Sequence, residues 1–329
     1  MTPGPSARQR GVALLIVLLL LATMSLVAIT MTQALRGATG RALSAESLDQ
    51  SRWYALGAEA LAAGIVQQQW LVRPAHDSRM EDWLTQPVFV PFDGGQIEAR
   101  IADDTGCFNL NSLVLRDDQA LEENPEARER FEYLLEALGL DAVARESIAE
   151  AIVDWLDTDF AAGTDGAEDG DYARLSTPYR AGNTLMADIT ELRAVMWISP
   201  ELYALLRPYV CVHPEIAATK ININLVTQAE APVLYAAFAG LLEPAEIESL
   251  IDAIPDQGFI IIDQFWALPV FSGRDLPAGI KDRFVLYSGW LRMDAKVNFN
   301  QAFILQRSLL EVDDKGAVRV AARTTGPDS

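Results

Sequence analysis

The sequence predicts an α+β fold with one long N-terminal helix, an antiparallel sheet, and a large all-α domain inserted into that sheet. Three observations support this prediction. A helical pattern without proline runs over residues 12–72, strand patterns occupy residues 88–102 and 283–323, and helical patterns fill most of the chain between them. Because strands on either side of a helical block can share one antiparallel sheet, an inserted helical domain is the simplest arrangement.

The long helix begins with 24 uncharged residues at positions 12–35. A helix of that length rises about 36 Å, which exceeds a hydrocarbon core of about 30 Å. A secretory signal peptide has a shorter apolar region of about 7–15 residues and a small-residue cleavage site after it. No such site follows closely here, so we expect a retained transmembrane helix. Arg8 and Arg10 precede it, which predicts a cytoplasmic N-terminus and export of the remainder. In a Gram-negative envelope the exported part would lie in the periplasm.

The remaining elements follow from periodicity, prolines and turn residues. Helices are predicted over residues 109–115, 125–138, 142–156, 190–196, 200–206, 232–241 and 244–254, and C-terminal strands over 283–294, 296–312 and 317–323. The expected organisation is a leader over 1–11, a transmembrane segment over 12–35, the first part of the sheet domain over 36–104, an inserted α-domain over 105–282, C-terminal strands over 283–323 and a tail over 324–329.

The helical block contains a weak internal repeat. Phe-Asn-Leu-Asn at 108–111 opens one helical group, and Ile-Asn-Ile-Asn at 221–224 opens another. Paired helices after each resemble SAM-like or helix-hairpin-helix units. Such units often bind DNA, but the chain has 46 Asp and Glu against 26 Lys and Arg, a net charge of −20. Phosphate binding needs clustered cations, so we expect no nucleic-acid partner and interpret these units as structural.

The two cysteines are Cys107 and Cys211. An isolated cysteine pair in an exported domain usually oxidises, so a disulfide is expected. Two unpaired buried thiols are the alternative, because cysteine is also a common core residue.

Seven acidic residues and no Lys or Arg lie between Asp154 and Asp171. Their mutual repulsion disfavours a folded loop unless a cation neutralises it, and oxygen ligands favour Ca²⁺ over Zn²⁺. Asp157, Asp159 and Glu168 would match positions one, three and twelve of an EF-hand, but alanines stand at positions five and six, so the segment is not an EF-hand.

Two other interpretations of the acidic segment stay open. Charge runs are often simply solvated, and paired carboxylates can perform hydrolysis if a pocket tunes one of them as an acid. Hydrolysis is the weaker of the two, because the sequence has no P-loop and no G-x-S-x-G motif, and no other catalytic group accompanies the acids.

Gly11 before a long apolar helix, with arginine just upstream, resembles the leader of type IV pilins and pseudopilins. The resemblance implies that a prepilin peptidase cleaves the bond between Gly11 and Val12 and that Val12 is then methylated. Most such subunits carry Glu at the fifth mature position, where this chain has Ile16. The glutamate is thought to meet the terminal amine of the subunit above, so an apolar residue fits a subunit that caps a fibre.

The motifs together resemble the general secretion pathway protein K family, the large minor pseudopilins of type II secretion. The resemblance covers residues 8–323 and rests on six segments: RGVALLIVLLLLA, IADDTGCFNLNSL, AIVDWLDTDF, GAEDGDYARLSTPYRAGN, MADITELRAV and ININLVTQAEAPVL. It implies a type IV pilin-like fold with an inserted α-domain, and a place at the pseudopilus tip with the minor pseudopilins I and J and other pseudopilins, anchored in the inner membrane.

The same resemblance implies calcium bound in the α-domain. By motif the implied ligands are Asp157, Asp159, Glu168 and Asp169, with Asp165 and Asn183 as further candidates. The alternative function is a membrane-anchored periplasmic hydrolase or a substrate-binding module displayed on a fibre.

Overall fold

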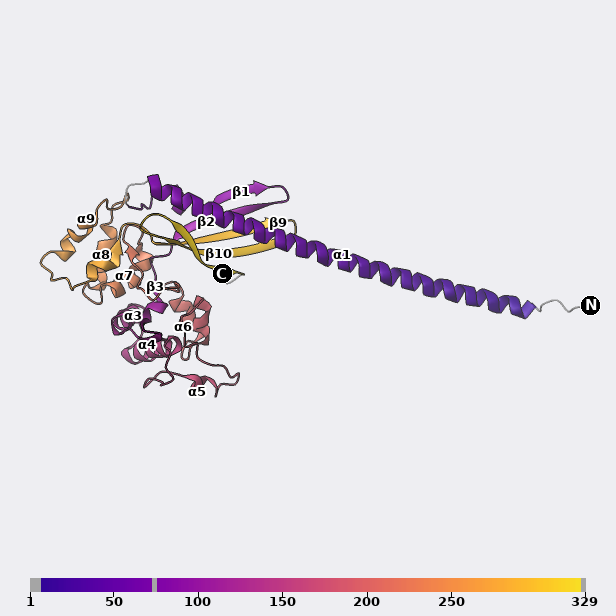
Figure 1. Cartoon of the computed structure of the whole chain (residues 1–329), viewed down its shortest axis with the longest axis horizontal. Coiled ribbons are helices and arrows are strands. Elements are labelled where there is room, and N and C mark those ends of the chain that lie inside the picture. Colours follow the sequence, from indigo (N-terminus) through magenta and orange to yellow (C-terminus); the bar gives the residue numbers. More distant parts are fainter. Residues whose placement is uncertain (1–6, 73–75, 327–329) are drawn as a thin grey trace, which may run out of the picture.

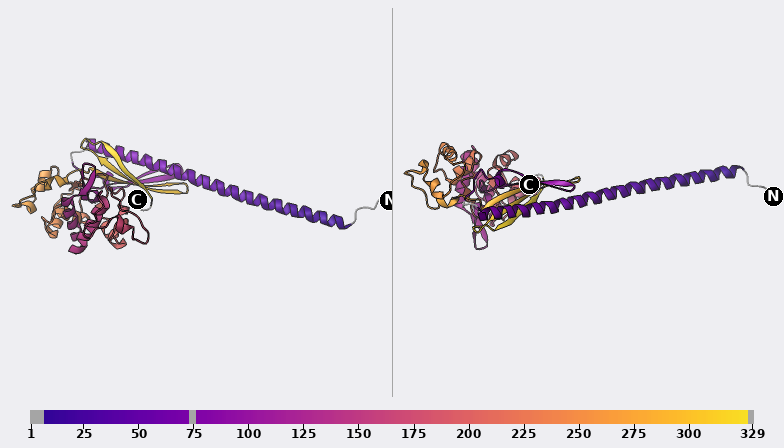
Figure 2. Two further views of the ribbon diagram at one scale, coloured as in Figure 1. Left: turned by 60° about the horizontal axis from the view of Figure 1, so that its bottom comes forward. Right: turned by 90° about the horizontal axis from the view of Figure 1, so that it is seen from above.

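The computed structural model describes residues 7–72 and 76–326, so residues 1–6 of the expected leader and 327–329 of the expected tail lie outside it. Its longest element is α1 (Ala7–Val72), whose first part extends away from the rest of the molecule (Figures 1 and 2). Every residue from 12 to 46 is exposed. Of the described helices, α1 is the one whose length and apolar composition would allow it to cross a membrane.

Most hydroxyl groups within this exposed part are satisfied by the helix itself. Five of them donate to backbone carbonyls three or four residues earlier: Thr23, Ser25, Thr30, Thr32 and Thr39. Because these donors do not depend on water, they suit a hydrocarbon environment.

The sheet has five antiparallel strands in the order β1-β2-β9-β10-β11. They are β1 (Val88–Phe92), β2 (Gly95–Asp103), β9 (Trp290–Phe299), β10 (Ala302–Val312) and β11 (Val318–Thr325). The pairing of β2 with β9, with Ile97 opposite Val297, joins strands that lie on either side of the helical block in the sequence. The predicted α+β fold with a shared antiparallel sheet is therefore confirmed.

The C-terminal part of α1 packs on one face of this sheet (Figure 1). It presents small buried side chains at helical spacing, Ala55, Ala58 and Ala62, which allow its backbone to approach closely. The sheet contributes apolar side chains from alternate positions of β9, Leu291, Met293, Ala295 and Val297. Side chains alternate along a strand, so the intervening residues of β9 face away from α1.

The helical block has an apolar core of its own. Its helices are α3 (Pro125–Ala137), α4 (Ala142–Leu156), α5 (Asp169–Tyr172), α6 (Pro200–Leu206), α7 (Ala231–Ala237), α8 (Pro244–Asp252) and α9 (Ile262–Trp266), with 3₁₀ turns η1 (Leu110–Leu113), η2 (Ile189–Ala194), η3 (Gln228–Glu230), η4 (Pro269–Phe271) and η5 (Ile280–Arg283). Its short strands are β3 (Phe108–Asn109), β4 (Val114–Asp117), β5 (Ala120–Glu123), β6 (Val210–Cys211), β7 (Ile221–Asn222) and β8 (Phe284–Val285), and α2 (Asp82–Thr85) lies in the connector before β1.

Capping residues determine where α3 and α4 begin and where α3 ends. Asn124 and Asp141 each accept a hydrogen bond from the backbone three residues later, and Gly139, with φ of 85°, follows the end of α3. These two helices match their predicted ranges within one residue. The predicted helix over 232–241 is shorter, because Ala239 and Gly240 adopt positive φ angles of 48° and 73° after α7.

The two Asn-x-Asn segments have the same local structure. Asn111 both accepts from and donates to the backbone of Met186, and Asn224 does the same with Phe259. Each segment also forms a two-stranded parallel pair, β3 with β6 and β7 with β8. The repeat noticed in the sequence is therefore a structural one, in which a buried asparagine joins the start of each unit to a later segment.

Several sequence predictions were wrong, including the helix expected over 190–196, which is the 3₁₀ turn η2. The expected helix over 109–115 is only the 3₁₀ turn η1, because the side chain of Asn109 caps the turn and Val114 is extended at its end. The expected break between strands at Ala295 does not exist, since β9 continues to Phe299 and the turn comes at Asn300. Residues 284–285 form β8, which pairs with β7 rather than with the five-stranded sheet.

Candidate functional site

The acidic loop after α4 is held in place by carboxylates from the last turns of that helix. Glu150 accepts a hydrogen bond of 2.7 Å from the backbone of Thr164, and Asp154 accepts one of 3.1 Å from Gly163. A Cβ atom at Gly163 or Gly166 would collide with these same two carboxylates. The loop backbone is therefore folded tightly against α4.

Three carboxylates converge at the base of this loop. Oxygen atoms of Asp157, Asp159 and Glu168 all lie within 4.8 Å of one another. Calcium binds oxygen at about 2.3–2.6 Å, so two ligands of one ion lie at most about 5 Å apart. The spacing of the three side chains is compatible with a single ion.

Two of these carboxylates are buried, and each has at least one oxygen without a hydrogen-bond partner in the described part of the chain. Asp157 is 8% exposed and Glu168 is 4% exposed. Among the described atoms, Oδ1 of Asp157 and both carboxylate oxygens of Glu168 have no hydrogen-bond partner. Burying unpaired charged oxygens costs several kcal/mol, and a bound cation would remove that cost. These orphaned oxygens are the observation that fits a metal ion.

Asn183 supplies a further oxygen beside the loop. It adopts a left-handed backbone with φ of 44°, and its Nδ2 donates to the carbonyl of Asp159 at 3.0 Å. Its Oδ1 is buried and has no hydrogen-bond partner within the described part of the chain. A neutral amide oxygen is an ordinary calcium ligand.

The other two candidate ligands do not join the group of three. Asp169 accepts a hydrogen bond of 3.0 Å from the backbone of Ala181, and its second oxygen lies 4.0 Å from Nε of Arg180. At Asp165 it is the backbone carbonyl that is engaged, accepting from the indole of Trp197 at 3.0 Å. Asp169 therefore supports the neighbouring chain, and the structure assigns no oxygen of Asp165 to the group.

The electrostatics of the loop favour proton or cation uptake. Burial raises the pKa of Asp157 to about 7, and the charges of Asp159 and Asp154 add to the rise. Burial also raises the pKa of Glu168 to about 7, helped by the charge of Asp157. The pKa of Asp154 rises to about 6, mainly through burial. A cation at the centre of these groups would stabilise their charged forms.

Sequence reasoning did not find the role of Glu150 and Asp154 in holding the loop. Their spacing of four residues places both on one face of α4, and this was the available signal. The face that α4 turns toward the loop could not be known before the helix was packed.

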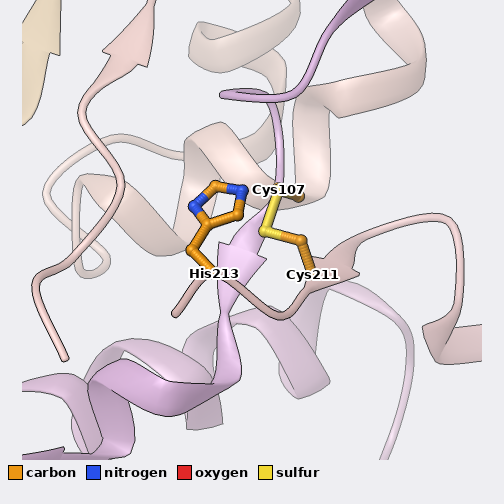
Figure 3. Close-up of side chains that lie close together, drawn as sticks. All are labelled: Cys107, Cys211 and His213. Atoms are coloured by element: carbon orange, nitrogen blue, oxygen red, sulfur yellow. A yellow bond between two sulfur atoms is a disulfide. The ribbon is translucent and has the colours of Figure 1, made fainter. Parts of the chain in front are cut away.

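The two cysteines form a disulfide with an S–S distance of 2.02 Å. It joins the start of the first helical unit to β6, where β3 and β6 run side by side. His213 lies next to it (Figure 3), and the three side chains are close enough to suggest a metal site. A disulfide provides no thiolate, however, and metals bind cysteine as thiolate.

His213 has a structural environment of its own. Its Nε2 lies 3.2 Å from Oδ2 of Asp104, and its ring stacks on Trp290 at 4.5 Å. Arg292 donates to the other oxygen of Asp104 at 2.9 Å. Burial alone would raise the pKa of Asp104, but the hydrogen bond to His213 and the charge of Arg292 lower it below its ordinary value. This cluster connects the helical block to the sheet.

Comparisons with known proteins agree with the fold. Family models described as type II secretion system (T2SS), protein K, match residues 106–215 and 221–286. These two ranges begin near the two Asn-x-Asn segments, so they coincide with the two helical units. Type II secretion system protein K of Pectobacterium carotovorum subsp. carotovorum is 35% identical over 325 residues, which covers 97% of each chain. The Klebsiella pneumoniae protein of the same description is 34% identical over 92% of this chain and 93% of its own.

A solved structure shows the same architecture. A chain from the crystal structure of the GspK-GspI-GspJ complex of enterotoxigenic Escherichia coli aligns with a TM-score of 0.74 and 27% identity. The alignment covers 87% of this chain and 99% of that one. The chain belongs to the type II secretion system protein K family and is a minor pseudopilin of that system.

Proposed function

We propose that this minor pseudopilin occupies the tip of the type II secretion pseudopilus, where it nucleates or caps the fibre that exports folded proteins across the outer membrane. Its partners there are the minor pseudopilins I and J, the counterparts of the two other subunits in the similar GspK-GspI-GspJ complex. Before assembly α1 anchors the chain in the inner membrane by a single crossing, and the sheet and helical block lie in the periplasm. We assign the chain an architectural role and no enzymatic one.

The observation that carries this proposal is the exposed part of α1. Residues 12–46 are all exposed, and the first 24 of them carry no charge and are mostly apolar, among them Leu15, Leu19 and Met24. A surface of this kind must be covered by lipid or by other helices. A subunit that moves from membrane to fibre needs both kinds of cover in turn.

The helical block supports placement at the tip. It lies beside the sheet at the end of the molecule opposite the N-terminus (Figure 1), where it would obstruct a subunit stacked above. Ile16 is 53% exposed on α1 and carries no carboxylate that could pair with the amine of a subunit above. Both features suit the first subunit of a fibre.

Processing follows the pattern of the leader. We propose that prepilin peptidase cleaves between Gly11 and Val12 and that Val12 is methylated. The charge-free sequence after Val12 supports retention of the helix after that cut.

We also propose that the acidic loop binds calcium through Asp157, Asp159 and Glu168, with Oδ1 of Asn183 as a further ligand. The ion would supply positive charge to a set of converging oxygens. These side chains, together with the hydrogen bonds from the loop to Glu150 and Asp154, would then hold the loop against α4.

The decisive experiment combines mass analysis with co-purification. The full chain would be co-expressed with prepilin peptidase and with pseudopilins I and J, then isolated from inner membranes through a tag on the chain. We expect a mature N-terminus at methylated Val12 and stoichiometric recovery of I and J. A chain that retains Met1, or that is cut after residue 30, would contradict the pseudopilin processing, and recovery without I and J would contradict the tip complex.

A further inference from the structure

A cleft of about 770 Å³ separates the helical block from the sheet. Its floor is the sheet face turned away from α1, which carries Arg292 of β9 and Arg307 and Leu309 of β10. Its wall is built by η2, α6 and the following residues up to Val212. The cleft lies outside the acidic loop and outside the surface of α1.

The cleft is positively charged in a strongly acidic protein. Five arginines line it, Arg193, Arg207, Arg292, Arg307 and Arg323, against two acidic residues, Asp104 and Asp188. The whole chain has only 26 Lys and Arg and carries a net charge of −20. Positive charge concentrated in one concave surface focuses the field toward an anionic partner.

Three of these arginines are neutralised within the chain. Arg292 pairs with Asp104 and Asp294, Arg307 pairs with Asp294, and Arg323 pairs with Glu59. Arg292 and Arg307 thereby fix the floor of the cleft, whereas the guanidinium of Arg323 lies on the opposite face of the sheet, against Glu59 of α1.

The two arginines of the wall are different. Arg193 is exposed, and its guanidinium lies 5.9 Å from the centre of the Tyr203 ring. Arg207 is exposed at the C-cap of α6. Within residues 7–72 and 76–326, neither of them has a carboxylate at ion-pair distance. These two guanidinium groups remain available for the carboxylates of a ligand.

The rest of the lining indicates the kind of ligand. Apolar residues, among them Pro208, Val212 and Ala322, also line the cleft. The strand β11 borders the cleft and is at the edge of its sheet, so its outer backbone groups pair with no strand of the described chain. An extended polypeptide can use such an edge, placing alternate side chains toward the cleft. A long nucleic acid would instead be repelled by the surrounding negative charge.

We propose that this cleft binds an extended acidic polypeptide segment of a partner protein, with its carboxylates on Arg193 and Arg207 and its backbone beside β11. The proposal does not depend on the position of the chain in the fibre or on calcium.

The test uses the full chain in detergent micelles and a fluorescein-labelled peptide in which Glu alternates with Val. Fluorescence anisotropy should show saturable binding that weakens as salt rises. Reversal of either wall charge, Arg193→Glu or Arg207→Glu, should weaken binding by about tenfold or more, since each replaces an attractive contact with a repulsion between like charges. Arg207→Gln, which introduces no repulsion, should have a smaller effect in the same direction.

Arg116→Glu is the matched control, because Arg116 is an exposed arginine on β4 that does not line the cleft. It should leave binding unchanged, and melting curves of all variants should coincide with that of the parent. The proposal is overturned if no saturable binding occurs, if a Gln-for-Glu peptide binds equally well, or if the wall variants bind like the parent. If single-stranded DNA bound to the same arginines more tightly than the Glu-Val peptide does, the assignment to a polypeptide would be overturned.

Discussion

Glu59 of α1 and Arg323 of β11 form an ion pair in which the carboxylate is buried. The geometry of this pair depends on an irregularity in the sheet. Nε of Arg323 donates to Oε2 of Glu59 at 2.8 Å, and Nη2 donates to Oε1. Leu309 lies opposite Ala322 and Leu310 opposite Val320, so Ala321 is the extra residue of a bulge. A bulge shifts the alternation of side chains by one position, and Arg323 thereby faces the same side as α1.

The ion pair predicts a loss of stability in Glu59→Gln. Burial alone would raise the pKa of Glu59, but the hydrogen bonds from Arg323 and Ser308 and the charge of Arg323 lower it below its ordinary value. Hydrogen bonds to a charged group contribute about 1.5–3 kcal/mol, so we expect the free energy of unfolding to fall by about that amount at pH 7. Urea unfolding of the full chain in detergent measures it.

The pH dependence of this difference has a definite sign. The folded-state pKa of Glu59 is lowered, so the stabilisation is present at neutral pH and is lost as the pH falls through that pKa. The difference between parent and Glu59→Gln should therefore shrink on acidification. A difference that stays constant or grows toward low pH would show that the charge of Glu59 is not what stabilises the packing of α1.

Calcium should raise the melting temperature of the chain. An ion present at a hundredfold excess over its dissociation constant stabilises the folded state by about 2.7 kcal/mol. For a helical block of this size that corresponds to about 5–10 °C. Scanning calorimetry in calcium and in chelator measures the shift, and Glu168→Gln should abolish it.

Two variants separate calcium binding from a simply solvated loop. In chelator, Glu168→Gln should be at least as stable as the parent, because it removes one of several buried like charges. Asp165→Asn should retain the calcium shift, since Asp165 lies outside the three converging carboxylates. An equal loss in Asp165→Asn and Glu168→Gln, or no shift in the parent, would contradict the proposed ligand set.

Removal of the disulfide should destabilise the helical block. The bond joins residues 104 positions apart, and loss of a native disulfide typically costs about 2–5 kcal/mol. We expect the double variant Cys107→Ala with Cys211→Ala to unfold at a lower urea concentration. A reductant should bring the parent to the same midpoint and leave the variant unaffected; an unchanged midpoint in the variant would contradict a stabilising role.

Ile16→Glu should impair the tip function without affecting the folded periplasmic part. A carboxylate within the hydrocarbon costs up to about 3 kcal/mol and favours a partner above it in the fibre. We expect less pseudopilin I and J to be recovered with the variant and a lower yield of exported proteins. Ile16→Leu keeps the residue apolar and should behave like the parent. Normal recovery and export with Ile16→Glu would show that an apolar residue is not required there.

Local sequence determined the main elements of this protein. The apolar run after Val12 predicted the exposed part of α1, because length and hydropathy alone decide whether a helix can span a membrane. Asn124, Asp141 and Gly139 fixed α3 and α4 through contacts within a few residues. The acidic composition of the loop also indicated a cation before any geometry was known.

The tertiary structure alone decided which of the acidic groups converge. Asp157, Asp159 and Glu168 meet because the hydrogen bonds of Glu150 and Asp154 fold the loop back on α4, and Asn183 joins them from 24 residues beyond Asp159. The face on which Arg323 lies depends in the same way on one extra residue in β11. The periodicity of apolar residues specifies whether a segment forms a helix or a strand. These contacts depend instead on the path of the loop backbone and on the register of the strands, which are fixed only when distant segments pack together.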